Sequence, residues 1–145
     1  MKKSLNISRE IRRVIDLEAQ ALLRVRGAVD GSYARAVEWM YACRGKVILT
    51  GVGKSGLIAQ KIAATLSSTG TPALYLQPGE AMHGSLGLIQ RSDLVVAIGK
   101  SGESDELSGM LPALRAIGAK LIAITANPKS TLAKQAGLVL ITPIT

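Results

Sequence analysis

The sequence is poor in cysteine and in aromatic residues, and both shortages exclude classes of protein. The single cysteine, Cys43, cannot form an internal disulfide and offers no spaced set of metal ligands. We expect it to be a small buried residue near a helix end. With three Tyr, one Trp and no Phe, the chain has few rings to stack on bases. Its net charge of +8 is scattered along the sequence, so we expect anionic small molecules or acidic segments as partners, and no nucleic acid.

The sequence also lacks a long apolar run. Lys, Arg, Gly and Ser interrupt every candidate before the ~20 residues that a membrane span requires. The start is basic, but the segment that follows, 11–29, is amphipathic and carries Arg12 and Asp16 where a signal peptide would need an apolar core. We therefore expect a cytoplasmic protein without membrane contact. Its 145 residues, 48% of them hydrophobic, are enough for one domain with a core.

Apolar residues at helical spacing predict two helices at the start of the chain, over 8–26 with Ser8 as N-cap and over 31–44. The basic residues of the first helix are interleaved with apolar positions that we expect to face the core. Beyond Gly45 short apolar runs alternate with helical segments. Strands are predicted over 46–50, 73–76, 94–98, 120–125 and 138–142, and helices over 54–68, 104–117 and 128–136, with a long loop and one helical turn over 77–92.

This alternation predicts an α/β fold. Strands that are apolar throughout and separated by helices are typical of a parallel sheet covered on both faces, and right-handed crossovers make such a sheet doubly wound. The predicted fifth strand, 138–142, ends shortly before Thr145, so no helix follows to cover it. Either another chain covers that edge or the sequence is a fragment of a longer polypeptide, and we expect the fragment.

The first glycine-rich loop, GVGKSG over 51–56, matches two nucleotide motifs only in part. A nicotinamide site needs an acid at the end of the second strand, but the first acid there, Glu80, lies beyond Pro78 and Gly79. A triphosphate loop needs glycine at position 48, which is Ile48. What remains is a helix N-terminus that favours an anion. Alternatively, the glycines only allow close packing of helix and strand.

A second loop, GKSGESDE over 99–106, follows the third strand in the same way. Its hydroxyls and backbone N–H groups suit a phosphomonoester. In the strand order 2-1-3-4-5 the first and third strands are neighbours, so their loops share one crevice. We expect the side chains of these two loops to converge there, together with a third loop that carries Glu80 and the only histidine. The side chains concerned are those of Lys54, Ser55, Ser101, Ser104 and Glu106, beside the backbone N–H groups around Gly102, with His83 in the third loop.

The three stretches GVGKSG, SSTGTPALYLQPGEAMHGSLG and SGESDE, in this order, resemble the sugar isomerase (SIS) domain. More closely they resemble arabinose 5-phosphate isomerases of the KpsF/GutQ type, over about 36–142. The resemblance implies a flavodoxin-like SIS fold for the whole chain, 1–145, with the last helix of the domain and any CBS domains absent. It also implies a homo-oligomer, a tetramer in the full-length protein, with shared active sites.

The resemblance further implies a function and roles for individual residues. The family interconverts D-ribulose 5-phosphate and D-arabinose 5-phosphate, the entry step to the 3-deoxy-octulosonate sugar of lipopolysaccharide. Lys54 and Glu106 match catalytic positions, and the substrate-binding positions are matched by Ser55, Gly70, Thr71, His83, Ser101, Gly102 and Ser104.

The chain departs from the family pattern in ways that affect these expectations. Lys100 replaces the usual Asn before the phosphate cradle, and Ser85 stands where a carboxylate is common. Gln77 occupies a position that is often a zinc-linked histidine, so we expect no metal there. The isomerisation that the resemblance implies requires neither a metal nor an organic cofactor. Two alternatives to a pentose phosphate isomerase stay open: a non-catalytic sugar-phosphate sensor, and an isomerase of another sugar phosphate.

Overall fold

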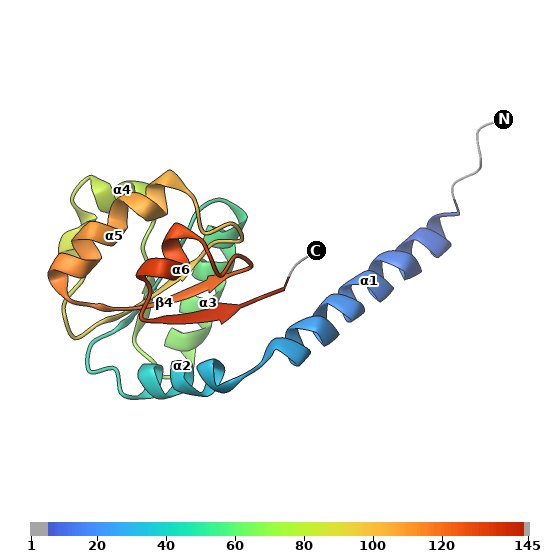
Figure 1. The fold of residues 1–145 in the computed structure, drawn as a ribbon, viewed down its shortest axis with the longest axis horizontal. Helices are drawn as coiled ribbons and strands as arrows, with labels where there is room; N and C mark the ends of the chain where they lie inside the picture. The colour runs from blue at the N-terminus through green and yellow to red at the C-terminus, as the bar shows by residue number, and fades with distance from the viewer. Residues whose placement is uncertain (1–5, 144–145) are drawn as a thin grey trace.

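The computed structural model describes residues 6–143 and confirms the α/β fold class (Figure 1). Five strands alternate with helices after two helices at the start, as predicted from the sequence. The helices are α1 (Ile7–Ala28), α2 (Gly31–Tyr41), α3 (Lys54–Ser68), α4 (Pro78–Met82), α5 (Asp105–Ile117) and α6 (Thr131–Gln135), with a 3-10 turn η1 (Ser85–Leu88). The strands are β1 (Val47–Gly51), β2 (Ala73–Tyr75), β3 (Leu94–Ile98), β4 (Lys120–Thr125) and β5 (Leu138–Ile141).

The strands form one parallel sheet in the predicted order β2-β1-β3-β4-β5. The central pair, β1 and β3, is in register from Val47 opposite Leu94 to Gly51 opposite Ile98. Helices α2 and α3 cover one face, and α4, α5 and α6 cover the other (Figure 1). Each face has its own buried cluster, with Leu49 and Val96 on the α3 side and Val95 and Met110 on the α5 side.

Some predicted boundaries are wrong, and local hydrogen bonds explain why. Helix α1 begins at Ile7, because the Asn6 side chain accepts from the Arg9 amide and caps the helix in place of Ser8. Helix α6 is shorter than the predicted 128–136. The Asn127 side chain accepts from the Lys129 amide and holds a turn there, so the helix begins only after its cap, Ser130.

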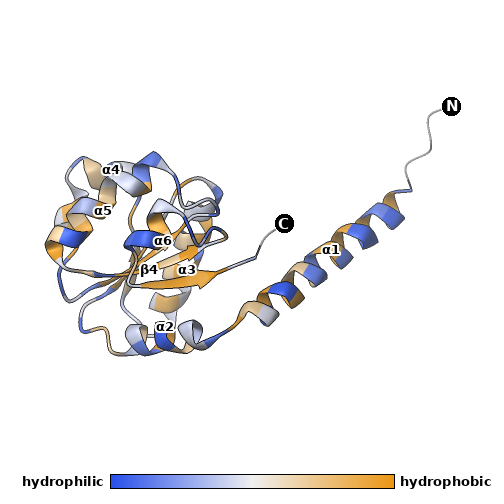
Figure 2. Cartoon of the chain, in the orientation of Figure 1, coloured by the Kyte–Doolittle hydropathy of each residue, from blue (hydrophilic) through white to orange (hydrophobic). Residues whose placement is uncertain are grey.

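The first helix departs most from expectation. Its apolar positions were expected to face the core, but no residue of α1 is buried, and the helix projects away from the domain (Figures 1 and 2). No helix within residues 6–143 is both long and apolar enough to cross a membrane.

Strand β5 is less exposed than its place at the sheet edge suggested. Leu138 and Leu140 are buried beneath α2, and the Tyr33 hydroxyl of α2 donates to the Ile141 carbonyl at 3.0 Å. Val139 packs partly on the opposite face. The expectation that the fifth strand lacks a helical cover is therefore wrong for one of its two faces.

The amino edge of the sheet is held by a buried ion pair. Asp93, which is 3% exposed, accepts from the Lys46 ammonium at 2.7 Å and from the Lys46 and Gln90 amides. Burial alone would raise the pKa of Asp93, but the hydrogen bonds from Lys46 and Gln90 outweigh it and lower the pKa. This pairing fixes the start of β1 beside β3 and so aligns the loops at their other ends.

Candidate functional site

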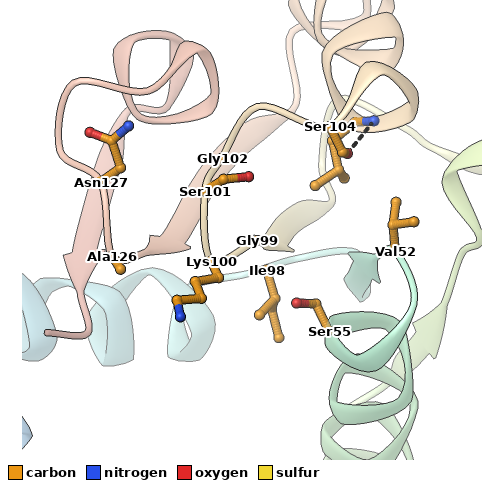
Figure 3. Close-up of a pocket in the computed structure, with 11 residues that line it drawn as sticks. Val52, Ser55, Ile98, Gly99, Lys100, Ser101, Gly102, Ser104, Ala126 and Asn127 are labelled. Carbon is orange, nitrogen blue, oxygen red and sulfur yellow. Dashed lines mark hydrogen bonds between the residues drawn. The ribbon is translucent and has the colours of Figure 1, made fainter. Parts of the chain in front are cut away.

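The two glycine-rich loops meet at the carboxyl edge of the sheet, as the strand order predicts. Between them lies a cavity of about 450 Å³. Its walls come from the β1–α3 loop, the β3–α5 loop and the β4–α6 loop (Figure 3). The lining residues are Val52, Ser55, Ile98, Gly99, Lys100, Ser101, Gly102, Ser104, Leu107, Ala126 and Asn127.

The polar groups of this cavity favour an anion. Among residues 6–143, Lys100 is the only formally charged residue in its lining. The Ser101 hydroxyl oxygen accepts from the Glu103 amide at 3.3 Å, and the Ser104 hydroxyl oxygen accepts from the Leu107 amide at 3.2 Å. Because each oxygen already accepts a backbone N–H, each hydroxyl proton remains available to donate. The cavity therefore offers donors and one positive charge.

The β3–α5 loop is held rigidly against α6. Gly102 has φ +67°, and a Cβ added there would lie 2.6 Å from the Ser130 Cβ. The Gly102 carbonyl accepts from the Leu132 amide at 3.1 Å, and Glu103 accepts from the Thr131 amide at 2.9 Å. The serine hydroxyls are thus positioned by a loop that tertiary contacts fix from behind.

Asn127 is a site residue that the sequence analysis missed. Its side-chain carbonyl accepts from the Lys129 amide at 3.0 Å, which leaves its NH₂ group as a donor. Figure 3 shows this nitrogen turned toward the Ser101 loop. The sequence could have indicated Asn127, because the loop after β4 lies at the same edge of a parallel sheet as the loops after β1 and β3.

The glycines of the first loop allow close packing of α3 on the sheet. A Cβ at Gly51 would lie 2.9 Å from the Ile98 carbonyl, and one at Gly56 would lie 2.8 Å from the Tyr75 hydroxyl. Gly53, at φ +57°, makes the turn. Within the described residues no side chain caps α3, and Ser55 in its first turn lines the cavity. The packing explanation of the sequence analysis thus holds for two of the three glycines.

Glu106 and Lys54 take different places around the crevice. Glu106 lines a smaller neighbouring cavity of about 100 Å³, together with Tyr75 and Gln77. Val52 belongs to the linings of both cavities, so the cavity of Glu106 adjoins the larger cavity that Ser101 and Ser104 line. Lys54 is the exposed first residue of α3 and lines neither cavity.

The other nearby acid, Glu103, has a structural role. Hydrogen bonds from Thr131 lower its pKa from the ordinary glutamate value. The bond to the Thr131 amide ties the carboxylate to the first turn of α6. The Glu103 carboxylate therefore holds the β3–α5 loop against α6, which makes it a poor candidate for the catalytic base.

The remaining predicted site residues do not line either cavity. His83 is exposed at the end of α4. Gly70 and Thr71 follow the C-terminus of α3, just before β2 begins. Helix α3 starts beside the larger cavity, and its 15 residues rise about 22 Å. Gly70 and Thr71, which follow its far end, therefore lie at the opposite edge of the sheet. Within one chain, Gly70 and Thr71 do not reach Ser101 and Ser104.

Metal-ligating side chains are not clustered within residues 6–143. No group of three or more His, Cys, Asp or Glu side chains in this range could hold a metal ion. Gln77, which stands where the resemblance places a zinc-linked histidine, lies in the smaller cavity beside Glu106.

Comparison with known proteins agrees with this architecture. A family model described as the SIS domain matches residues 40–145. The chain belongs to the SIS domain family. Among relatives of this SIS domain, arabinose 5-phosphate isomerase KdsD of Yersinia pestis is 43% identical over 127 residues, covering 88% of this chain and 39% of the relative. Arabinose 5-phosphate isomerase KpsF of Escherichia coli O6:H1 is 45% identical over 131 residues, covering 90% and 40%.

A solved structure has the same fold. The E. coli CFT073 protein in complex with arabinose 5-phosphate has a TM-score of 0.85 and 36% identity, and the alignment covers 97% of this SIS domain and 77% of that chain. The chain spans only about 40% of the length of the curated isomerases it matches. The relationship to arabinose 5-phosphate isomerases is thus established, while the roles of individual residues stay predictions.

Proposed function

We propose that this SIS domain binds a pentose 5-phosphate and is the isomerising domain of an enzyme that interconverts D-ribulose 5-phosphate and D-arabinose 5-phosphate. One observation carries the proposal: a cavity whose lining includes Lys100 and three serines adjoins, at Val52, a second cavity that Glu106 lines. An anchored phosphate and a nearby carboxylate are what an isomerase of a small sugar phosphate requires. The identity to KdsD and KpsF supports the choice of substrate.

The phosphate is assigned to the larger cavity. Ser101 and Ser104 donate through their hydroxyls, and Asn127 donates through its amide. The uncapped N-terminus of α3 and Lys100 supply positive charge. Binding energy from this remote group then holds the reacting carbons near Glu106.

The reaction is a proton transfer through a cis-enediolate. Glu106 removes a proton from C1 of the ketose, and the electron pair moves onto the C2 carbonyl oxygen. The resulting carboxylic acid returns the proton to C2, while the O1 proton passes to O2 and C1 becomes the aldehyde carbon. We assign stabilisation of the enediolate oxygen to Lys54, the exposed first residue of α3, and orientation of a hydroxyl or ring opening to His83, the exposed residue that ends α4. These two roles rest on the resemblance to the family, because both residues lie outside the linings of the two cavities. Atoms and charge balance without a co-reactant.

A second candidate is a sugar-phosphate sensor, which needs the serine cradle but no base. Glu106 in the adjoining cavity favours an enzyme, because a carboxylate beside a phosphate would weaken the binding of a mere ligand. An isomerase of another sugar phosphate would use the same two cavities with a different sugar between them.

An assay separates these candidates. The 145-residue chain, and a chimera that carries the remaining C-terminal part of Y. pestis KdsD after Thr145, are incubated with ribulose 5-phosphate and, separately, with a hexulose 6-phosphate, and the aldose phosphate formed is quantified. Binding of arabinose 5-phosphate is measured by calorimetry in parallel. Turnover by either chain supports the proposal. Binding by both without turnover favours the sensor, and turnover only of another sugar phosphate favours the alternative isomerase.

A further inference from the structure

Two adjoining cavities lie at the amino edge of the sheet, opposite the candidate functional site. The indole cavity, as we call it, measures about 260 Å³ and lies between the end of α5 and the start of β4. The arginine cavity measures about 200 Å³ and lies between the end of α2 and the start of β3. Trp39 of α2 and Lys120, the first residue of β4, line both. Taken together, the two have a volume typical of small-molecule sites, which is roughly 300–1,000 Å³.

The indole cavity has an aromatic wall on an apolar floor. Its wall is Trp39, which is half-buried. A Cβ added at Gly137 would lie 3.0 Å from the edge of the indole, so glycine at this position leaves room for the ring. The Lys120 ammonium lies 4.9 Å from the ring centroid. Leu114 and Leu121, both buried, form the floor. An indole beside aliphatic side chains suits a planar ring.

The arginine cavity is lined by three exposed cations, Arg44, Arg91 and Lys120. Arg91 also reaches toward the indole cavity. A Cβ added at Gly118, which lines the indole cavity, would lie 3.6 Å from the Arg91 Cγ and 3.7 Å from its Nε. The side chain of Arg91 therefore packs where the two cavities meet. Neither salt bridge formed within residues 6–143 involves any of the three cations.

The acid beside these cations is already paired. Among residues 6–143, Asp93 is the only carboxylate that lines either cavity. It is 3% exposed and accepts from the Lys46 ammonium at 2.7 Å and from the amides of Lys46 and Gln90. Its charge is thus offset by Lys46, and the three lining cations give the arginine cavity a net positive charge.

We infer that the two cavities form a second ligand site, which binds a nucleoside diphosphate. The base lies against Trp39 in the indole cavity, because a planar base stacks on an indole. The two phosphates lie in the arginine cavity, where the guanidinium groups of Arg44 and Arg91 bind phosphate oxygens in pairs. Lys120, on a flexible stem, turns its ammonium from the indole toward the phosphates. The site is independent of the proposed isomerase function, since none of its residues lines the two cavities at the carboxyl edge.

Helix dipoles alone explain these cations less well. A cation near a helix C-terminus is stabilised by the dipole, and this accounts for Arg115, which lies in the last turn of α5 and donates to the Gln135 side chain at 3.4 Å. Lys120 begins a strand and is not explained in this way. The dipole also requires no aromatic wall. A phosphate without a ring would leave the indole of Trp39 without a contact.

The fluorescence of Trp39 reports on this site directly, because it is the only tryptophan in the chain. ADP is titrated into the 145-residue chain from about 1 µM to 5 mM, with excitation where adenine does not absorb and with calorimetry in parallel. Binding should change the emission and should weaken as salt rises. Pyrophosphate, which lacks the base, should bind about tenfold more weakly or worse. Saturating arabinose 5-phosphate should leave the affinity for ADP unchanged.

Two variants with the same change of charge test the contact. Arg91→Gln should raise the dissociation constant of ADP about tenfold, because a charge-assisted hydrogen bond to phosphate is lost. Arg35→Gln, on α2 and outside both linings, should leave it unchanged. Both positions are exposed, so circular dichroism should show the same fold for both variants.

Each outcome supports or overturns the inference, whether or not arabinose 5-phosphate binds. Weaker binding in Arg91→Gln alone supports the nucleotide site. Absence of both an emission change and heat overturns it, and the cations then serve the helix C-termini. Displacement of ADP by arabinose 5-phosphate would place ADP at the carboxyl edge and also overturns it. Equal affinities for ADP and pyrophosphate contradict the placement of a base on Trp39, and equal weakening in both variants contradicts a contact with Arg91.

Discussion

The β1–α3 and β3–α5 loops look alike in sequence but differ in how the structure uses them. Both follow a central strand, contain glycines and open a helix. In the first, Gly51 and Gly56 allow helix and strand to approach closely, and α3 starts without a side-chain cap. In the second, Ser104 caps α5, and Gly102 fits against Ser130. The second loop is fixed from behind by hydrogen bonds with α6, whereas the first is held at Gly51, whose carbonyl accepts from the Tyr75 hydroxyl of β2.

This difference suggests a division of labour within one site. The first loop contributes an open helix N-terminus and leaves Lys54 exposed, whereas the second contributes positioned hydroxyls. A hydrogen-bond donor that is already positioned loses less entropy when it binds a ligand. The rigid β3–α5 loop therefore suits the phosphate, and the open β1–α3 loop suits the reacting end of the sugar. Four sets of substitutions test this comparison.

The largest effect is expected at the base. Glu106→Gln should lower turnover about a thousandfold, because the amide cannot accept the substrate proton, and should leave sugar-phosphate binding largely intact. Steady-state kinetics and calorimetry on whichever chain shows activity measure both. Asp105→Asn, the neighbouring acid in the first turn of α5, is the control and should keep most of the activity. Unchanged turnover in Glu106→Gln would remove this residue from the mechanism.

An added methyl group in the rigid β3–α5 loop should lower the free energy of unfolding much more than one in the open β1–α3 loop. Gly102→Ala would meet Ser130 at a positive φ, and we expect it to lower the free energy of unfolding by about 3 kcal/mol. Gly53→Ala, also at positive φ but in open space, should lower it by about 1–2 kcal/mol. Urea unfolding followed by circular dichroism compares the two. Equal losses would mean that the two loops are equally constrained.

The positive charge of Lys100 in the larger cavity should have a moderate effect on ligand binding. Lys100→Asn removes a positive charge from the lining of the larger cavity and should weaken binding of arabinose 5-phosphate about fivefold, with a smaller dependence on salt. Lys129→Asn makes the same change of net charge on the exposed turn before α6 and is the control. Equal weakening in both variants would indicate a general effect of charge instead of a contact in the cavity.

The smallest effect is a pH dependence from Glu103. Hydrogen bonds from Thr131 lower its pKa in the folded protein, so its contribution to stability is present above the ordinary glutamate pKa of about 4.3 and is lost as the pH falls through the lower folded value. Glu103→Gln should therefore be less stable than wild type at about pH 6, and the difference should shrink between about pH 5 and pH 3. Urea midpoints across this range measure it, with Glu38→Gln on α2 as control. A difference that stays constant with pH would contradict the assignment.

Much of the fold could be predicted because the sequence signals are local. Helix α3 and strands β3 and β4 begin and end where apolar spacing placed them, and parallel strands joined by helices leave few topologies. The serine cradle was predictable for the same reason, since loops after neighbouring parallel strands share one edge.

Contacts between distant segments decided the rest. Asn127 joins the cavity only because β4 places its loop beside the other two, and Glu103 is withdrawn from catalysis by an amide 28 residues away. The periodicity of α1 showed an apolar face but not what that face contacts, and the structure turns it outward. Apolar spacing records which side of a helix avoids water, whereas the surface that covers it is set by packing. The sequence by itself thus determined the sheet and the chemistry at its carboxyl edge, and tertiary structure decided which groups meet there and which surface of the chain remains without a partner.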